Sequence, residues 1–177
     1  RSSDLAFTMI KKLSVTVLLA VATVMLTSAQ ANLTAYVTDD DPNGVNVRST
    51  PGGAVAMCLP DTASYMLVLS SVSNGWWKVE NIEVAETGES LELNASSTGL
   101  WIHNSVIGFS TRNYGGQRWC LRSKPSEKSR ATYWFRQEIM LHPLQVKGDW
   151  IEVVTNDGHQ GWIESVNICD NPLTNCC

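Results

Sequence analysis

The sequence predicts an all-β protein made of two tandem copies of one small barrel-like unit. Segments of one half recur in the other half in the same order, and clusters of turn-forming residues separate short runs in which apolar and polar residues alternate. No sustained 3.6-residue periodicity follows residue 31, so long helices are not expected there. Short, regularly spaced strands of this kind are typical of small β-barrels and sandwiches.

The repeat has a constant spacing over most of its length. The matched pairs, all 74 positions apart, are 47–51 (VRSTP) with 121–125 (LRSKP), Met66 with Met140, Trp76 with Trp150, and Val79 with Val153. This spacing is expected to hold without a gap from the first of these strands to the tryptophan strand. A repeat of this length indicates two copies of one structural unit.

The constant spacing ends after the tryptophan strands. Trp101 matches Trp162 at a shift of 61, which leaves thirteen additional residues in the first copy. They fall within 81–99, which we interpret as a lengthened, partly paired and acidic hairpin arm.

Alternation within the strands separates inner from outer positions, because successive side chains of a strand point to opposite faces. In WWKV (76–79), Trp77 and Val79 should face the core while Trp76 faces outward. The same register places Trp150 outward in the second copy. The other expected core residues are Ile102, Ile151, Val153 and Ile163, and Trp101 and Trp162 are expected to pack rather than bind ligand.

The first residues have the pattern of a cleaved signal peptide over 9–31. A basic start at Lys11 and Lys12 precedes an apolar run, 13–26, and Ala29-Gln30-Ala31 is a small-x-small cleavage site. The apolar run is shorter than the roughly 20 residues of a membrane-spanning helix, so no membrane span is expected after cleavage. The expected divisions are then 32–108 and 109–172 for the two copies and 173–177 for a cysteine-containing tail.

Charge argues against a nucleic-acid partner. After residue 31 there are ten Lys and Arg against sixteen Asp and Glu, whereas binding to phosphates needs a basic face. The basic residues that cluster in the second copy are interpreted as a solvated rim; they are Arg118, Arg122, Lys124, Lys128, Arg130 and Arg136.

The repeated motifs resemble a known family. VNVRSTP, NGWWKV and GLWIHNSVI in the first copy, and WCLRSKP, GDWIEV and GWIESVNI in the second, are similar to bacterial Src-homology-3-like (SH3-like) domains over about 33–108 and 109–170. The first copy departs from the family in its inserted arm. The second departs at Cys120, where the family usually has Asn.

The resemblance implies a binding function for a bacterial periplasmic or secreted protein. In related domains the first aromatic residue of the Trp-Trp pair lines a ligand groove, which implies that Trp76 and Trp150 bind ligand. Packing beneath a loop or against the neighbouring domain is the alternative. The second copy is the preferred binder, because the acidic arm is expected to cover the groove of the first. Its Arg122, Lys124 and Arg130 are expected to meet carboxylates of the ligand.

Two ligand classes stay open. Exported members of the family bind cell-wall material, which implies the peptide of peptidoglycan; the alternative is an extended segment of an envelope protein. Catalysis is not expected, because His103, His142 and His159 are too scattered for a metal cluster and no cysteine-peptidase segment is present. Neither a metal nor another cofactor is expected, and the oligomeric state stays open.

All five cysteines lie in the exported part, where disulfides can form. In this class of barrel the opening and closing strands are neighbours, which implies a disulfide between Cys120 and Cys169. Cys58 is expected to pair with Cys176 or Cys177.

Overall fold

The computed structural model describes residues 32–93 and 99–174. The expected signal peptide, 9–31, lies outside the described residues, as do Cys176 and Cys177. Within the part described, no helix is long and apolar enough to cross a membrane.

The described residues form one antiparallel sheet of fourteen strands with two short 3-10 turns. The first half contains β1 (Leu33–Val37), β2 (Val45–Arg48), β3 (Val55–Leu59), β4 (Tyr65–Ser73), β5 (Trp76–Val84), β6 (Glu89–Ser90), β7 (Leu100–His103) and η1 (Asn104–Val106). The second half contains β8 (Ile107–Thr111), β9 (Trp119–Arg122), β10 (Ala131–Phe135), β11 (Met140–Lys147), β12 (Trp150–Thr155), β13 (Gln160–Glu164), η2 (Ser165–Asn167) and β14 (Ile168–Cys169). The prediction of an all-β chain is confirmed.

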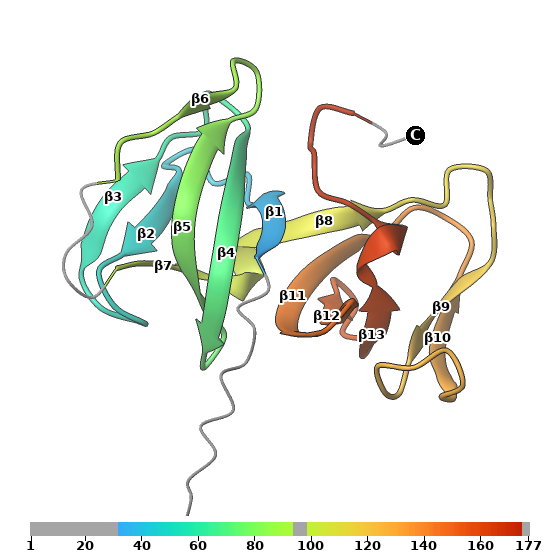
Figure 1. Ribbon diagram of the computed structural model, residues 1–177. Helices are drawn as coiled ribbons and strands as arrows, with labels where there is room; N and C mark the ends of the chain where they lie inside the picture. Colours follow the sequence, from blue (N-terminus) through green and yellow to red (C-terminus); the bar gives the residue numbers. More distant parts are fainter. Residues whose placement is uncertain (1–31, 94–98, 175–177) are drawn as a thin grey trace, which may run out of the picture.

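The order of strands across the sheet reads the same from its centre in both directions. The path is β10-β9-β13-β12-β11-β8-β1-β4-β5-β7-β2-β3. Each strand on this path therefore has an equivalent at the same distance from the central β8–β1 pair, while β6 and β14 lie off the path. The two groups of strands lie on either side of β8, which runs between them (Figure 1).

One strand, β8, belongs to both halves. Its first residues pair with β1, where Tyr36 faces Gly108, and its later residues pair with β11, where Leu141 faces Phe109. Strand β14 also pairs with β8, at Ser110 and Thr111. The expected boundary between residues 108 and 109 thus falls inside a strand.

The expectation of a gap-free repeat is wrong in one hairpin. Strands β2 and β9 are 74 positions apart, but β3 and β10 are 76 apart, because Cys58 faces Asn46 while Trp134 faces Cys120. The loop 123–130 is two residues longer than its equivalent, 49–54. The following connection, counted to the matched Met66 and Met140, is two residues shorter (136–139 against 60–65). The two changes cancel, so an ungapped comparison of the two copies does not detect them.

The inserted residues of the first half extend a strand. β5 continues to Val84, and β6 pairs with its end, so that Glu83 faces Ser90 and Val84 faces Glu89. This hairpin arm lies at the end of β5 opposite Trp76 (Figure 1).

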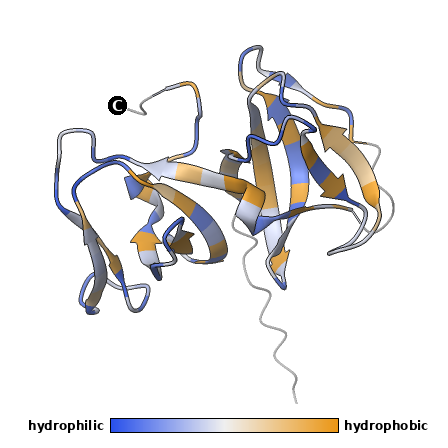
Figure 2. Cartoon of the chain, turned by 180° about the vertical axis from the view of Figure 1, so that it is seen from behind, coloured by the Kyte–Doolittle hydropathy of each residue, from blue (hydrophilic) through white to orange (hydrophobic). Residues whose placement is uncertain are grey.

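The core follows the alternation that the sequence predicts. The predicted core residues Trp77, Val79, Ile102, Ile151, Val153 and Ile163 are all buried. Polar and apolar residues alternate along the long strands (Figure 2). Trp162 is 8% exposed, which confirms that it packs, and Trp101 is half-buried.

The implied disulfide between Cys120 and Cys169 is wrong. Cys120 is a free cysteine; it lies on β9, whose neighbours are β10 and β13, whereas Cys169 lies on β14, which pairs with β8. The first half opens with β1 and the second half with β8, and each of these strands precedes the VRSTP or LRSKP motif of its half. Cys120 lies beside the LRSKP motif on β9, and therefore not on the opening strand that pairs with β14. Cys169 is disulfide-bonded, but not to Cys120. Cys58 is also free, so its expected pairing is wrong as well.

Candidate ligand-binding groove

A groove of about 430 Å³ lies on the second half, and we call it the Trp150 groove. Residues of four strands (β9, β10, β12 and β13) and of η2 line it, together with residues of the adjoining loops. Its lining residues are Arg118, Trp119, Cys120, Arg122, Glu127, Trp134, Trp150, Ile163, Glu164 and Asn167.

Local turn geometry places Trp150 at the groove. It is the first residue of β12, directly after a two-residue turn in which Gly148 has a φ of +59°, a conformation that favours glycine. Lys147 and Trp150 face each other across this turn. The alternation of β12 then directs Ile151 into the core and leaves Trp150 half-buried on the other face.

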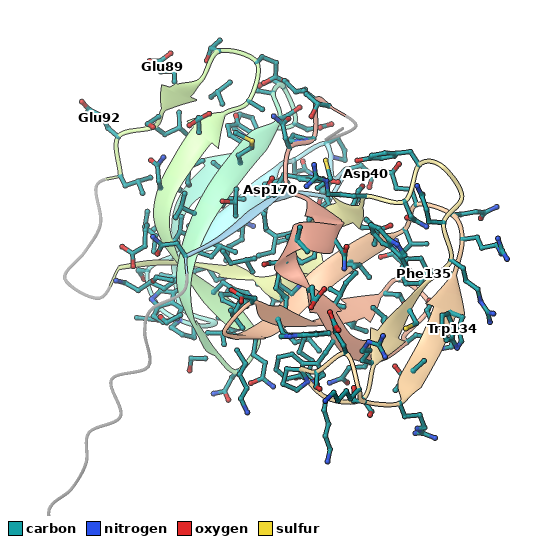
Figure 3. All side chains as sticks on the ribbon, turned by 45° about the vertical axis from the view of Figure 1, so that its right-hand side comes forward. Asp40, Glu89, Glu92, Trp134, Phe135 and Asp170 are labelled. Atoms are coloured by element: carbon teal, nitrogen blue, oxygen red, sulfur yellow. The ribbon has the colours of Figure 1, made fainter. Side chains whose placement is uncertain are left out.

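Trp134 stands on the opposite side of the groove. It lies on β10, at the end of the sheet, and half of its surface is exposed (Figure 3). The guanidinium of Arg118 lies over its ring, 4.2 Å from the ring centroid. A cation at this distance is attracted to the face of an indole ring, so the two side chains hold each other in place.

The charged residues of the groove are of both signs. Arg122 donates a hydrogen bond from Nη1 to the backbone oxygen of Ser129 (2.9 Å), which ties the base of loop 123–130 to β9. Together with Arg118 it provides two positive groups. Glu127 and Glu164 provide two negative groups. Charges of both signs therefore line the groove.

The structure brings together only some of the residues that sequence reasoning selected. Trp150 and Arg122 both line the Trp150 groove, whereas Lys124 and Arg130 are exposed and are not among its lining residues. Sequence reasoning missed Trp134 and Arg118. The two-residue difference between the loops hid the position of Trp134, because in the gap-free comparison it matches Pro60 rather than Cys58.

Trp76 has different surroundings in the first half. The guanidinium of Arg48 lies 5.7 Å from its ring centroid, and the imidazole of His103 meets it edge-on with the centroids 5.0 Å apart. The positions equivalent to Trp134 and Arg118 hold Cys58 and Gly44. The first half thus lacks the second aromatic wall. Among the described residues, Arg48 and His103 contact Trp76, whereas β6 of the acidic arm pairs with the other end of β5.

A second hollow lies beyond Trp134, on the outer side of β10. We call it the arginine groove; its volume is about 540 Å³, and its lining residues are Arg118, Tyr133, Trp134, Phe135, Arg136, Gln137 and Ile139. Arg118 and Trp134 belong to both grooves, so they form the ridge between them.

The three histidines have different contacts. Nδ1 of His103 contacts the hydroxyl of Ser105, His142 lies between Ile107 O and Asn156 Oδ1, and His159 stacks on Tyr133. Among the described residues, no three His, Cys, Asp or Glu side chains are grouped so that they could hold a metal ion.

Comparison with known protein families gives a match over part of the second half. Residues 115–170 match the family model of the bacterial SH3 domain. This segment resembles bacterial SH3 domains. It makes up about a third of the chain and contains β9 to β14 with the Trp150 groove.

The solved structures that are similar to the chain are more distant. They include NlpC1 from Trichomonas vaginalis, at 12% identity and a TM-score of 0.30, and NlpC2 from the same organism, at 13% identity and a TM-score of 0.30. Both matches cover 80% of this chain, but only 47% of NlpC1 and 49% of NlpC2. The chain therefore spans about half the length of these proteins. No curated protein matches the chain significantly.

Proposed function

We propose that this protein is an exported, non-catalytic binding protein that recognises the peptide part of bacterial peptidoglycan. The observation that carries the proposal is the Trp150 groove, in which three tryptophans and four charged side chains converge within the segment that matches the bacterial SH3 domain. Apolar walls with a few convergent polar groups are typical of a ligand site.

The proposal includes two tandem SH3-like barrels. The mirrored order of strands supports a second barrel in the first half, since every strand from β1 to β7 except β6 has an equivalent. Arg48 supports it too: its Nη1 donates to Gly53 O (2.7 Å), as Arg122 donates to Ser129 O. A 3-10 turn of three residues follows the last long strand in both halves.

The charges of the groove favour a peptide with both an acid and an amine. Arg118 and Arg122 suit carboxylates, because a guanidinium donates two parallel hydrogen bonds to such a group. Glu127 and Glu164 suit an ammonium group. Peptidoglycan stems present both groups on a short extended chain, and the aromatic faces of Trp134 and Trp150 suit its apolar parts.

A second candidate is an adaptor that binds an extended segment of an envelope protein. The position of β10 favours it: β10 ends the sheet and pairs only with β9 among the described strands. A strand at the edge of a sheet can accept another strand by backbone hydrogen bonding.

Sedimentation with purified cell-wall sacculi tests the proposal. The wild-type protein should sediment with the sacculi, and Trp134→Ala should weaken this binding by about tenfold or more, as loss of an aromatic anchor does. Val55→Ala is the matched control, because Val55 is also 50% exposed on the equivalent strand β3 and should bind like the wild type.

A wild-type protein that does not sediment contradicts the proposal. Capture of an envelope protein by the wild type but not by Trp134→Ala then supports the adaptor. Export has its own test: the secreted or periplasmic protein should begin at Asn32, and a mature protein that retains Lys11 and Lys12 contradicts cleavage.

A further inference from the structure

We propose that the arginine groove is an anion subsite, which takes a carboxylate of the same ligand that occupies the Trp150 groove. The inference rests on the proposed function and extends it, because it assigns a ligand group to a surface outside that groove. The ridge of Arg118 and Trp134 lies between the two hollows, so an extended ligand leaving the Trp150 groove crosses it directly.

The charge of the arginine groove is of one sign. Arg118 and Arg136 are its charged lining residues, and no carboxylate lines it. Neither guanidinium forms an ion pair within the part of the chain that the structure describes. The guanidinium of Arg118 lies 4.2 Å from the Trp134 ring centroid, and its N–H groups donate to no protein acceptor among the described residues.

A buried asparagine fixes the backbone beside both arginines. Asn113 is 1% exposed, and its Nδ2 donates to Gln117 O (3.3 Å) and to Gln137 O (3.1 Å). These carbonyls belong to the residues next to Arg118 and Arg136 in the chain. The Oδ1 of Asn113 accepts from the hydroxyl of Thr111 (2.7 Å), which completes its hydrogen bonding. A buried side chain thus links the backbone beside Arg118 to the backbone beside Arg136, which favours a preorganised site.

The first half supplies an internal comparison. A hollow of about 170 Å³ lies at the equivalent place, where Gly44, Leu59, Pro60, Asp61 and Tyr65 stand in the positions of Arg118, Phe135, Arg136, Gln137 and Ile139. Asp39 and Asp61 make this hollow acidic, and Pro172 of the C-terminal segment also lines it. The two halves therefore share the concavity, while only the second carries the charge that attracts an anion.

The test compares two probes by calorimetric titration: a muropeptide with free stem carboxylates and the same muropeptide with those carboxylates amidated. The wild type should bind the free acid about tenfold more tightly, the effect of a charge-assisted contact.

Arg136→Gln should abolish this preference and leave binding of the amidated probe unchanged. Arg136→Lys should keep part of the preference, because it keeps the charge. Lys128→Gln is the control: it removes the same charge from an exposed loop position outside both grooves, and it should keep the full preference.

Two results overturn the subsite. One is a full preference for the free acid in Arg136→Gln, which shows that Arg136 does not hold the carboxylate; the other is equal binding of both probes by the wild type. If the wild type binds neither muropeptide, the proposed function fails, and titration with N-acetyl-tetraglutamate decides the subsite separately. Shifts of the Trp134 indole N–H resonance that disappear in Arg136→Gln support the subsite, and their absence in the wild type overturns it.

Discussion

The indole of Trp77 donates a hydrogen bond from Nε1 to the backbone oxygen of Pro143, at 3.0 Å and buried from solvent. Trp77 lies on β5 of the first half and Pro143 on β11 of the second, so the bond joins the two halves away from the shared strand β8. The equivalent of Trp77 in the second half is Ile151, which has no hydrogen-bonding group. Among the described residues this hydrogen bond therefore has no counterpart at Ile151.

Replacing Trp77 should destabilise the whole protein. Trp77→Ala should lower the free energy of unfolding by about 3–5 kcal/mol, because it leaves a cavity in the core. Trp77→Phe should lower it by about 1–3 kcal/mol, since the Pro143 oxygen loses its donor while buried. Denaturant unfolding measures both, and Trp76→Phe serves as the half-exposed control. A Trp77→Phe protein as stable as the wild type would show that the bond to Pro143 contributes nothing.

The two outward tryptophans should differ in binding. Trp150→Ala should weaken binding to sacculi by about 2 kcal/mol or more, the effect of removing an aromatic hot spot. Trp76→Ala should weaken it far less, because Arg48 and His103 contact Trp76 and the first half lacks an equivalent of Trp134. If Trp150→Ala binds normally but melts early, Trp150 is a packing residue and the groove is assigned wrongly.

Tyr36 should make the protein less stable at alkaline pH. Burial raises the pKa of its phenol above the ordinary value of 10.0, although the hydrogen bond with Ser110 Oγ (3.0 Å) opposes the shift. Below pH 10 the phenol is neutral in the folded and unfolded states, so its full contribution to stability is present. As the pH rises through 10, the unfolded chain loses this proton first, and stability falls until the folded pKa is reached.

The matched comparison for this effect is Tyr36→Phe. Its free energy of unfolding should fall less steeply than that of the wild type between about pH 9 and 11. Equal slopes for the two proteins would contradict a raised pKa for Tyr36.

The free cysteines should react in the native protein without a reductant. Cys58 is exposed and should be alkylated faster than the half-buried Cys120, whereas Cys169 should not react. Because Cys120 lines the Trp150 groove, a bulky maleimide at this position should reduce binding to sacculi, and the same label on Cys58 should not. Peptide mapping measures the labels. A Cys120 that reacts only after reduction would restore the disulfide that the sequence implied.

The sequence by itself determined the repeat and the direction of the strand side chains. Alternation with a period of two is a local property of a strand, so it correctly placed Trp77 and Ile151 inside and left Trp76 and Trp150 on the opposite face. The shift of 74 positions correctly matched β2 with β9 and β5 with β12. These inferences need only the neighbours of each residue along the chain.

Only the tertiary structure decided which residues share a groove and which cysteines are close. Trp134 reaches the groove through the pairing of β10 with β9 and of β9 with β13, contacts between segments distant in sequence. The sequence comparison did not show its position, because the longer loop before β10 and the shorter connection after it cancel in length. The two halves can then be aligned without a gap although β3 and β10 are out of step. Cys169 likewise lies apart from Cys120, because β14 pairs with β8 whereas Cys120 lies on β9, between β10 and β13. Strand neighbours in a sheet are set by hydrogen bonding across the whole fold rather than by order along the chain.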